Sequence, residues 1–198
     1  MRAIGRVHQQ VSGIDPDGRP YSATDPTLLA WVHVALIDSM LEAYLRFGTN
    51  GPLDADDYVA DMAVVGAAMG VLDPPRSQAE LDEAFATFLP DLTGSAQVND
   101  VRRFVLAPPL SAPARLGYGV LARAAEDSLQ PWASTMLDSP RRSPRAEAAN
   151  ARAASALLTT LQVALVESPA RAAARDRLGV SAEHMDALRA ERVARSAR

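Results

Sequence analysis

Apolar residues recur along this chain at the spacing of amphipathic helices, and no segment of useful length alternates apolar and polar residues as a half-buried strand would. The predicted fold class is therefore all-α, a single-domain bundle of about seven or eight helices without a sheet. Helices are expected at 2–12, 26–47, from 54 onward, and at 77–88, 95–106, 113–137, 144–167 and 181–195.

The first predicted helix carries one histidine. Ile4, Val7, His8 and Val11 follow the i, i+3, i+4, i+7 spacing of a single helix face, and Gly13 suits a C-terminal cap. His8 is therefore expected to face the interior. The Pro-, Gly- and Asp-rich segment 14–26 predicts an ordered loop that ends where Asp25 caps the next helix.

The predicted helix at 26–47 is long enough, at about 33 Å, to cross a domain of this size. It is the expected central helix of the bundle. At 100° per residue one narrow apolar stripe forms, and it places His33 among apolar neighbours. The members of this stripe are Leu29, His33, Leu36, Met40 and Phe47.

Two further helix starts are marked by capping residues. Asp54 precedes a helix whose expected buried ridge is Tyr58, Met62, Val65 and Met69. Ser77 and Glu80 have the spacing of a capping box. The aspartates at 54, 56, 57 and 61 are consistent with a metal cluster, but their position at a helix N-terminus favours stabilisation by the helix dipole.

Composition narrows the class of protein. With 198 residues, 48% hydrophobic and 22% charged, the chain has the profile of an ordinary globular protein of one domain. It contains no run of 18 apolar residues and lacks the layout of a signal peptide, so a cytoplasmic protein without a membrane span is expected. A net charge of −4 gives no reason to expect nucleic acid as a partner.

The chain contains no cysteine, which excludes disulfides, iron-sulfur clusters, thiolate ligands and a cysteine nucleophile. A metal would have to depend on His8, His33, His184 and carboxylates. Paired Glu-x-x-His motifs, phosphate-binding loops and the Gly-x-Ser-x-Gly elbow do not occur in the sequence.

Several motifs occur in a characteristic order near the N-terminus. They are R-V-H-x-x-V-x-G at 6–13, D-G-x-P-Y-x-A-x-D-P at 17–26, L-L-x-W-V-H at 28–33, D-S-x-L-x-A-Y at 38–44 and D-x-D-x-Y at 54–58. Together they resemble the family that groups mpaB-type oxygenases with the catalytic domain of latex-clearing rubber oxygenases (DUF2236). The resemblance extends over most of the chain.

This resemblance implies an all-α oxygenase and, for the rubber-oxygenase branch, a b-type haem (haem b) that activates dioxygen to cleave a carbon-carbon double bond. The implied partners are a small apolar substrate and dioxygen. His8 best matches the histidine that holds the iron, with His33 as the alternative ligand. Tyr21, Asp25 and Trp31 join them as implied cofactor-binding or pocket residues.

Family members also carry an upstream helical region with an Arg-x-x-x-Thr-like element that lines the distal pocket. Seven residues precede His8 here, so the sequence predicts a truncated member that lacks this part. Apolar surface left uncovered usually leads to association, and a homodimer is the expected result. The alternative to an enzyme is a non-catalytic helical module that binds an apolar ligand or a partner chain.

Overall fold

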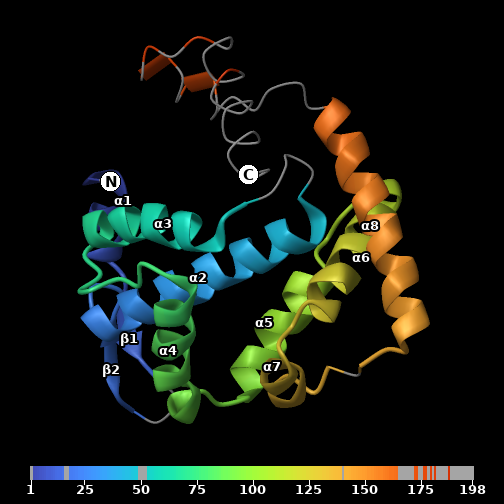
Figure 1. The fold of residues 1–198 in the computed structure, drawn as a ribbon. Coiled ribbons are helices and arrows are strands. Elements are labelled where there is room, and N and C mark those ends of the chain that lie inside the picture. The colour runs from blue at the N-terminus through green and yellow to red at the C-terminus, as the bar shows by residue number, and fades with distance from the viewer. Residues whose placement is uncertain are drawn as a thin grey trace. The chain divides into compact units, whose positions relative to one another are not determined.

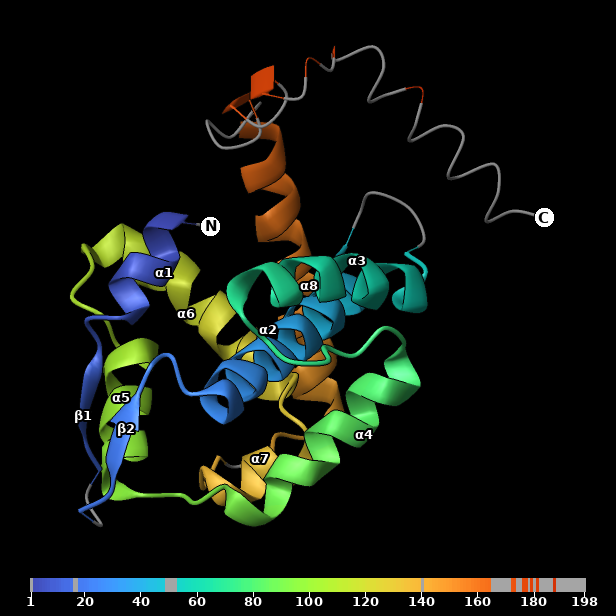
Figure 2. The same cartoon turned by 90° about the vertical axis from the view of Figure 1, so that its left-hand side faces the viewer.

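The structure is a computed structural model that describes residues 2–15, 18–48, 53–139 and 141–164, with isolated positions between 172 and 187. The all-α class is confirmed, because helices form most of the described chain (Figures 1 and 2). The helices are α1 Arg2–His8, α2 Pro26–Phe47, α3 Ala55–Met69, α4 Gln78–Phe88, α5 Ala96–Leu106, α6 Ala112–Asp127, α7 Pro131–Met136 and α8 Pro144–Ala164, with a 3-10 turn at Leu89–Asp91.

The chain forms two compact units. Unit 1 contains residues 1–46 and 53–93, and unit 2 contains residues 47–52 and 94–198. The predicted single domain stays a prediction. The helix expected at 181–195 and the last turn of the helix expected at 144–167 lie outside the continuously described residues.

The core of unit 1 is built where α2, α3 and α4 meet. Its fully buried side chains come from one face of α2 and from the two other helices, and they are Val34, Ile37, Leu41, Val59 and Leu81. Burying a side chain of this size contributes about 1.5–3 kcal/mol relative to leaving it exposed. These contacts hold α2 in a fixed rotation about its own axis.

The bounds predicted for α2 are confirmed, but the predicted buried stripe is rotated. His33 is buried as expected, whereas Leu36 and Met40 are 46% and 50% exposed and Ile37 is fully buried instead. Since α2 is apolar on nearly every side, its sequence periodicity selects a face only weakly. The choice between neighbouring faces is made by packing against α3 and α4.

The predicted caps of α3 and α4 are confirmed. The side chain of Asp54 accepts hydrogen bonds from the backbone N–H groups of Asp56 and Asp57, at 3.0 and 3.2 Å. Ser77 Oγ accepts the N–H of Glu80, and Glu80 returns a bond to the N–H of Arg76, one residue before the cap.

The buried ridge of α3 is displaced by one position from the prediction. Val59, Ala63 and Gly66 are buried, while Val65 is 39% exposed. The small side chains at 63 and 66 are what allow another helix to come close. The predicted ridge residues Tyr58 and Met62 do pack against the core, so the prediction is confirmed in part, and the larger apolar side chains flank the most buried positions.

A short antiparallel hairpin corrects the expectation of no sheet. Strand β1, Ser12–Ile14, pairs with β2, Pro20–Ser22, in a register that places Gly13 opposite Tyr21. Strands of three residues are too short to produce a detectable alternation. The turn between them is closed by Asp15, whose Oδ1 accepts the N–H of Arg19 at 2.7 Å, and by Gly18 at a φ of 81°.

The hairpin also shortens the first helix. α1 ends at His8, so Val11 lies beyond the helix and is 44% exposed, and Gly13 is a strand residue and not a helix cap. A side chain at Gly13 would displace the Tyr21 ring, because an ideal Cβ there would lie 2.8–2.9 Å from the ring and hydroxyl of Tyr21. The close approach in the hairpin, rather than helix termination, explains this glycine.

In unit 2 the predicted helix at 113–137 is divided into two. α6 ends at Asp127 and α7 begins at Pro131. Proline has no N–H to continue the helical bonding pattern, and the N–H of Ser128 instead closes the last turn of α6 on Ala124 and Ala125. α8 packs along α6, as Figure 1 shows.

A half-buried charge network joins the parts of unit 2. Glu126 accepts Arg102 at 2.6 Å and Arg142 at 3.3 Å, and Arg142 also reaches Asp127 at 3.2 Å. Asn150 of α8 donates to the same aspartate at 3.2 Å. Each carboxylate is therefore compensated by at least one arginine, which offsets the cost of its partial burial.

Replacing Gly94 with alanine is expected to destabilise unit 2. An ideal Cβ at this position would overlap the backbone oxygen of Met136, so the backbone must shift, at a cost of about 1–3 kcal/mol. The measurement is the free energy of unfolding in denaturant.

Gly119→Ala is the matched control, because its Cβ would meet only the flexible end of Arg123 at 3.5 Å. Alanine in a helix interior is favoured over glycine by about 0.5–1 kcal/mol, so this variant should gain stability. Equal stability of the two variants would show that the contact at Gly94 is not tight.

Candidate functional site

His33 on α2 lies against Gly66 of α3. Its side chain is 7% exposed, and an ideal Cβ on Gly66 of α3 would lie 2.6, 2.7 and 3.0 Å from its Cε1, Nε2 and Nδ1 atoms. Because the three distances are nearly equal, Gly66 lies over the face of the imidazole ring and not at its edge. The lone pair and N–H of the ring, which lie in its plane, are therefore not directed at the Gly66 Cα.

The Nε2 atom of His33 is buried and has no hydrogen-bond partner among the described residues. Burial also lowers the pKa of His33 from its ordinary value of 6.5, so the imidazole is neutral at neutral pH. A buried polar atom without a partner costs about 1–3 kcal/mol. Such an atom is the kind of group that a metal ion, a cofactor or a ligand can satisfy.

Trp31 lines the opposite side of α2 from that contact and packs against α4. Its ring centroid lies 5.5 Å from those of Phe85 and Phe88, at interplanar angles of 68° and 58°. Edge-on aromatic contacts of this kind stabilise helix packing by about 0.5–1.5 kcal/mol beyond the area that they bury. Trp31, an implied pocket residue, thus packs α2 against α4.

Tyr21 and Asp25 have local structural roles. The Tyr21 ring covers Gly13 in the hairpin and is 45% exposed, and Asp25 Oδ1 accepts the N–H groups of Thr27 and Leu28 at 2.8 and 3.2 Å. Asp25 is therefore the N-cap of α2. It fixes the start of the helix that carries His33.

His8 is the last residue of α1 and is half-buried, in contrast with the deeply buried His33. Its backbone oxygen accepts the N–H of Val11 at 3.1 Å, which closes the turn that leads into the hairpin. The two candidate iron ligands therefore differ in access: His8 lies at the edge of unit 1, and His33 lies inside it.

Two further groups in unit 1 were not identified as candidate site residues from the sequence. Tyr58 on α3 has a buried hydroxyl without a partner among the described residues, and burial raises its pKa. Asp38 on α2 has a pKa raised by burial and, secondarily, by the nearby charges of Asp82 and Glu42. Tyr58 was predicted to be buried, but the lack of a partner for its hydroxyl and the burial of the Asp38 carboxyl depend on which helix packs above each residue.

The donor set bears on what kind of metal site unit 1 can form. Among the described residues, no three histidine, aspartate or glutamate side chains gather in a way that could hold a metal ion. At the start of α3, Asp54 caps the helix, and Asp56 accepts the N–H of Gln78 at 2.7 Å. A haem needs only one histidine from the protein, and this requirement fits the residues present.

Among the helices that the structure describes, α2 is long and apolar enough to cross a membrane by length and composition. The central helix of a globular core meets the same two criteria. The burial of Val34, Ile37 and Leu41 against α3 and α4 accounts for part of this apolar character.

The fold and the site describe an all-α protein with a neutral histidine in its interior, whose Nε2 has no partner in the part of the chain that the structure describes. The family model described as the catalytic domain of ER-bound oxygenase mpaB/B′ and rubber oxygenase matches residues 1–162 of this chain. The protein therefore belongs to this family, as its N-terminal motifs predicted. No match was found among curated proteins or among solved structures.

His33 should make the folded state sensitive to mild acid. Since its pKa is lowered by burial, the unfolded chain binds a proton at this residue more readily, and stability should fall as the pH drops below the ordinary value of 6.5. His33→Asn removes the titration. Its free energy of unfolding should show a shallower slope than the wild type between about pH 7 and pH 5.5, and identical slopes would contradict the burial of a neutral imidazole.

Gly66→Ala should be destabilising although alanine favours helices. The new Cβ would overlap the His33 ring, at a cost of about 1–3 kcal/mol that outweighs a gain of about 0.5–1 kcal/mol from helix propensity. In the double variant Gly66→Ala/His33→Ala the overlap disappears, so the losses in unfolding free energy should be less than additive. Additive losses would mean that the two residues do not touch.

Proposed function

We propose that the protein is a haem-dependent oxygenase that acts on an apolar substrate. The observation that carries the proposal is the buried, neutral and unpartnered Nε2 of His33, within the segment that matches an oxygenase catalytic domain. A polar atom kept inside an apolar core at a cost is expected to have a functional partner.

The two histidines suit different tasks. His8 is the proposed iron ligand, because it occupies the matching motif position and its half-buried side chain leaves room for a large flat cofactor to approach. His33 is enclosed, with Gly66 over its ring, and is proposed to hydrogen-bond through Nε2 to a group in the pocket. When bound, haem would supply the iron that activates dioxygen.

The remaining residues of unit 1 would prepare the site. Trp31, held by Phe85 and Phe88, packs the other side of α2 against α4 and so would fix the rotation in which α2 presents His33. Asp25 fixes the N-terminus of α2 and thereby the position of His33 along the helix. Gly66 keeps the imidazole in one orientation because its missing side chain lets α3 press on the ring.

A non-catalytic module that binds an apolar ligand or a partner chain is the second candidate. The observation in its favour is an outward face of α2 that exposes large apolar side chains, namely Leu28, Val32, Leu36 and Met40. Exposed apolar surface of this kind usually marks an interaction. The two candidates differ in whether the protein binds haem.

Reconstitution with haemin tests the proposal. The wild-type protein should bind haem at a one-to-one ratio and show a Soret band, and His8→Ala should lose most of that band, because the histidine that holds the iron is gone. His33→Ala should keep the band but alter the affinity of the iron for a distal ligand such as cyanide.

Gln9→Ala is the matched control, an exposed neighbour of His8 whose removal should leave the spectrum unchanged. Loss of the band in His33→Ala with retention in His8→Ala would exchange the two roles. A wild-type protein without specific haem binding would contradict the oxygenase proposal and favour the non-catalytic module.

A further inference from the structure

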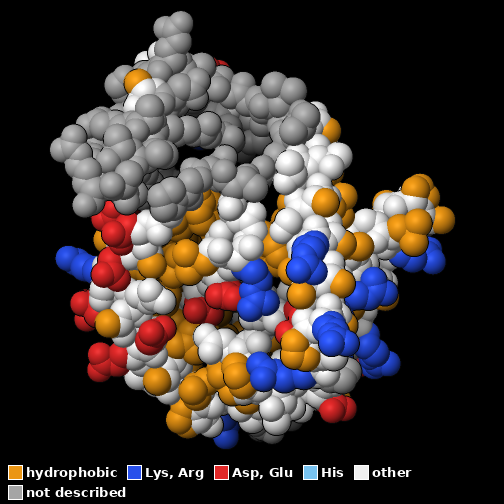
Figure 3. Space-filling view, turned by 45° about the vertical axis from the view of Figure 1, so that its right-hand side comes forward, with side chains coloured by type: hydrophobic (Ala, Val, Ile, Leu, Met, Phe, Trp, Pro, Cys, Tyr) orange, Lys and Arg blue, Asp and Glu red, His pale blue; other side chains and the backbone are white. Residues whose placement is uncertain are grey.

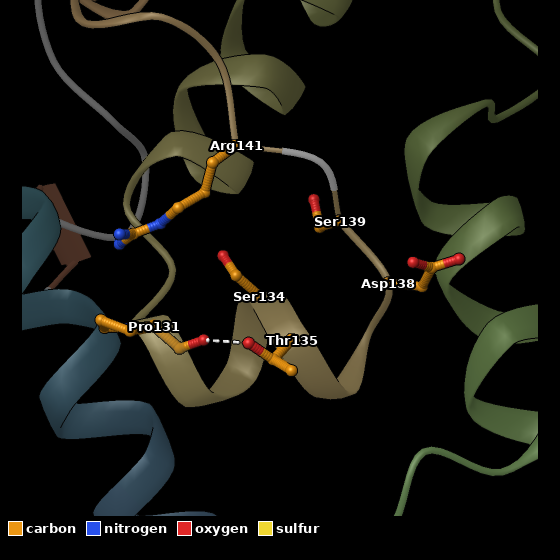
Figure 4. A pocket seen from close by; sticks show the side chains of 6 residues that line it. All are labelled: Pro131, Ser134, Thr135, Asp138, Ser139 and Arg141. Carbon is orange, nitrogen blue, oxygen red and sulfur yellow. Dashed lines mark hydrogen bonds between the residues drawn. The ribbon is translucent and has the colours of Figure 1, made fainter.

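A cavity of about 270 Å³ lies beside α7 in unit 2, and the function proposed above makes no use of it. Its size is close to the lower limit of pockets that hold small organic ligands. Its walls come from α7 and from the segment that leads to α8, and they are formed by Pro131, Ser134, Thr135, Asp138, Ser139 and Arg141. Figure 4 shows these side chains around the opening.

The floor of the cavity contains a buried hydroxyl group. Ser134 is only 6% exposed, and its Oγ makes no hydrogen bond with the described residues, whereas the neighbouring Thr135 hydroxyl is occupied by the backbone oxygen of Pro131 at 2.9 Å. The hydroxyl of Ser139 donates to Glu126 at 3.3 Å, so its oxygen can still accept a hydrogen bond. Ser134 Oγ is therefore available both to donate and to accept.

The positive charge at the cavity comes from Arg141. Arg142 forms ion pairs with Glu126 and Asp127, whereas Arg141 makes no ion pair with the described residues. In Figure 4 the guanidinium of Arg141 and the carboxylate of Asp138 lie on opposite sides of the opening, and Asp138 points away from it. The cavity lining therefore carries the charges of Arg141 and Asp138, and the Arg141 guanidinium has no ion-pair partner among the described residues.

The helices and loops around the cavity also carry more positive than negative side chains. Residues 94–164 contain eight arginines and five carboxylates, although the whole chain has a net charge of −4. Figure 3 shows many arginine side chains on the face of unit 2 that it displays. The exposed members are Arg103, Arg115, Arg123, Arg141, Arg145 and Arg152. A surface with this excess attracts anions to its concave parts.

We propose that this cavity binds a small organic monocarboxylate. The carboxylate would pair with the Arg141 guanidinium, whose planar fork suits that group, and Ser134 Oγ would donate a hydrogen bond to one of its oxygens. A single arginine matches a single negative charge, whereas a dianionic phosphate would be left half compensated. The ring of Pro131 provides an apolar surface for a short alkyl tail.

Calorimetric titration of the full-length protein with butyrate tests this inference. Butyrate should bind saturably at one site, and butyramide, which has the same shape without the charge, should not bind. Inorganic phosphate should bind more weakly than butyrate. Arg141→Gln should weaken butyrate binding about tenfold or more, as expected for the loss of a charge-assisted hydrogen-bonded pair.

Arg145→Gln is the matched control, since it removes the same charge from an exposed position nearby that does not line the cavity, and it should retain wild-type affinity. Ser134→Val should also abolish binding by filling the floor. Equal binding of butyrate and butyramide, equal loss in both arginine variants, or unchanged binding in Arg141→Gln would overturn the proposal. Both arginines are exposed, so these variants are expected to fold.

Discussion

The contact between the His33 ring and Gly66 is the constraint on which unit 1 depends. A glycine at this point lets the α3 backbone lie over the imidazole face, where even a single Cβ would overlap three ring atoms. The approach brings the Val34, Ile37 and Leu41 side of α2 against Val59, and this set then closes over Leu81 of α4. The same approach removes His33 from water and keeps it neutral. The close approach of Gly66 therefore accounts both for the packing of α2 against α3 and for the neutral state of His33.

Unit 2 is held by a different kind of interaction. Its helices contribute few fully buried side chains, of which Ala124, Ala133 and Ala154 are examples, and their small size allows close helix packing but buries little apolar area. The arginine and carboxylate network around Glu126 supplies additional links between α5, α6 and the segment before α8. Losing one partner of such a partly buried pair is costly, because the other charge stays partly removed from water without compensation. The network thus favours the arrangement in which these elements meet.

The sequence predicted local structure well where one residue determines it. Asp54 and Ser77 mark helix starts because a cap is a local hydrogen bond, and Pro26 to Phe47 is a helix because no breaker interrupts it. The buried face of α2 was not predictable, since the helix is apolar on most sides. The two-strand hairpin was missed because its pairing depends on contacts too few to leave a pattern.

The candidate site was predictable in part for a similar reason. Family motifs pointed to His8 and His33, and the structure places one at the end of a helix and the other inside the core. Asp25 could be foreseen as a helix cap from its position before Pro26. The role of Gly66 could not be foreseen. It depends on His33, which packs against it from another helix, and not on the neighbours of Gly66 in the sequence.

The central claim is that His33 is a buried neutral imidazole whose Nε2 makes no hydrogen bond with the described residues and is satisfied when haem binds. Nitrogen-15 NMR of the histidine side chains, recorded just below pH 6.5 without haem and again with carbon-monoxide-ligated ferrous haem, tests it most directly. The account predicts neutral-form signals for His33 in the first sample and a shift of its Nε2 signal in the second. A protonated His33 in the first sample, or an Nε2 signal unchanged by haem, would contradict it.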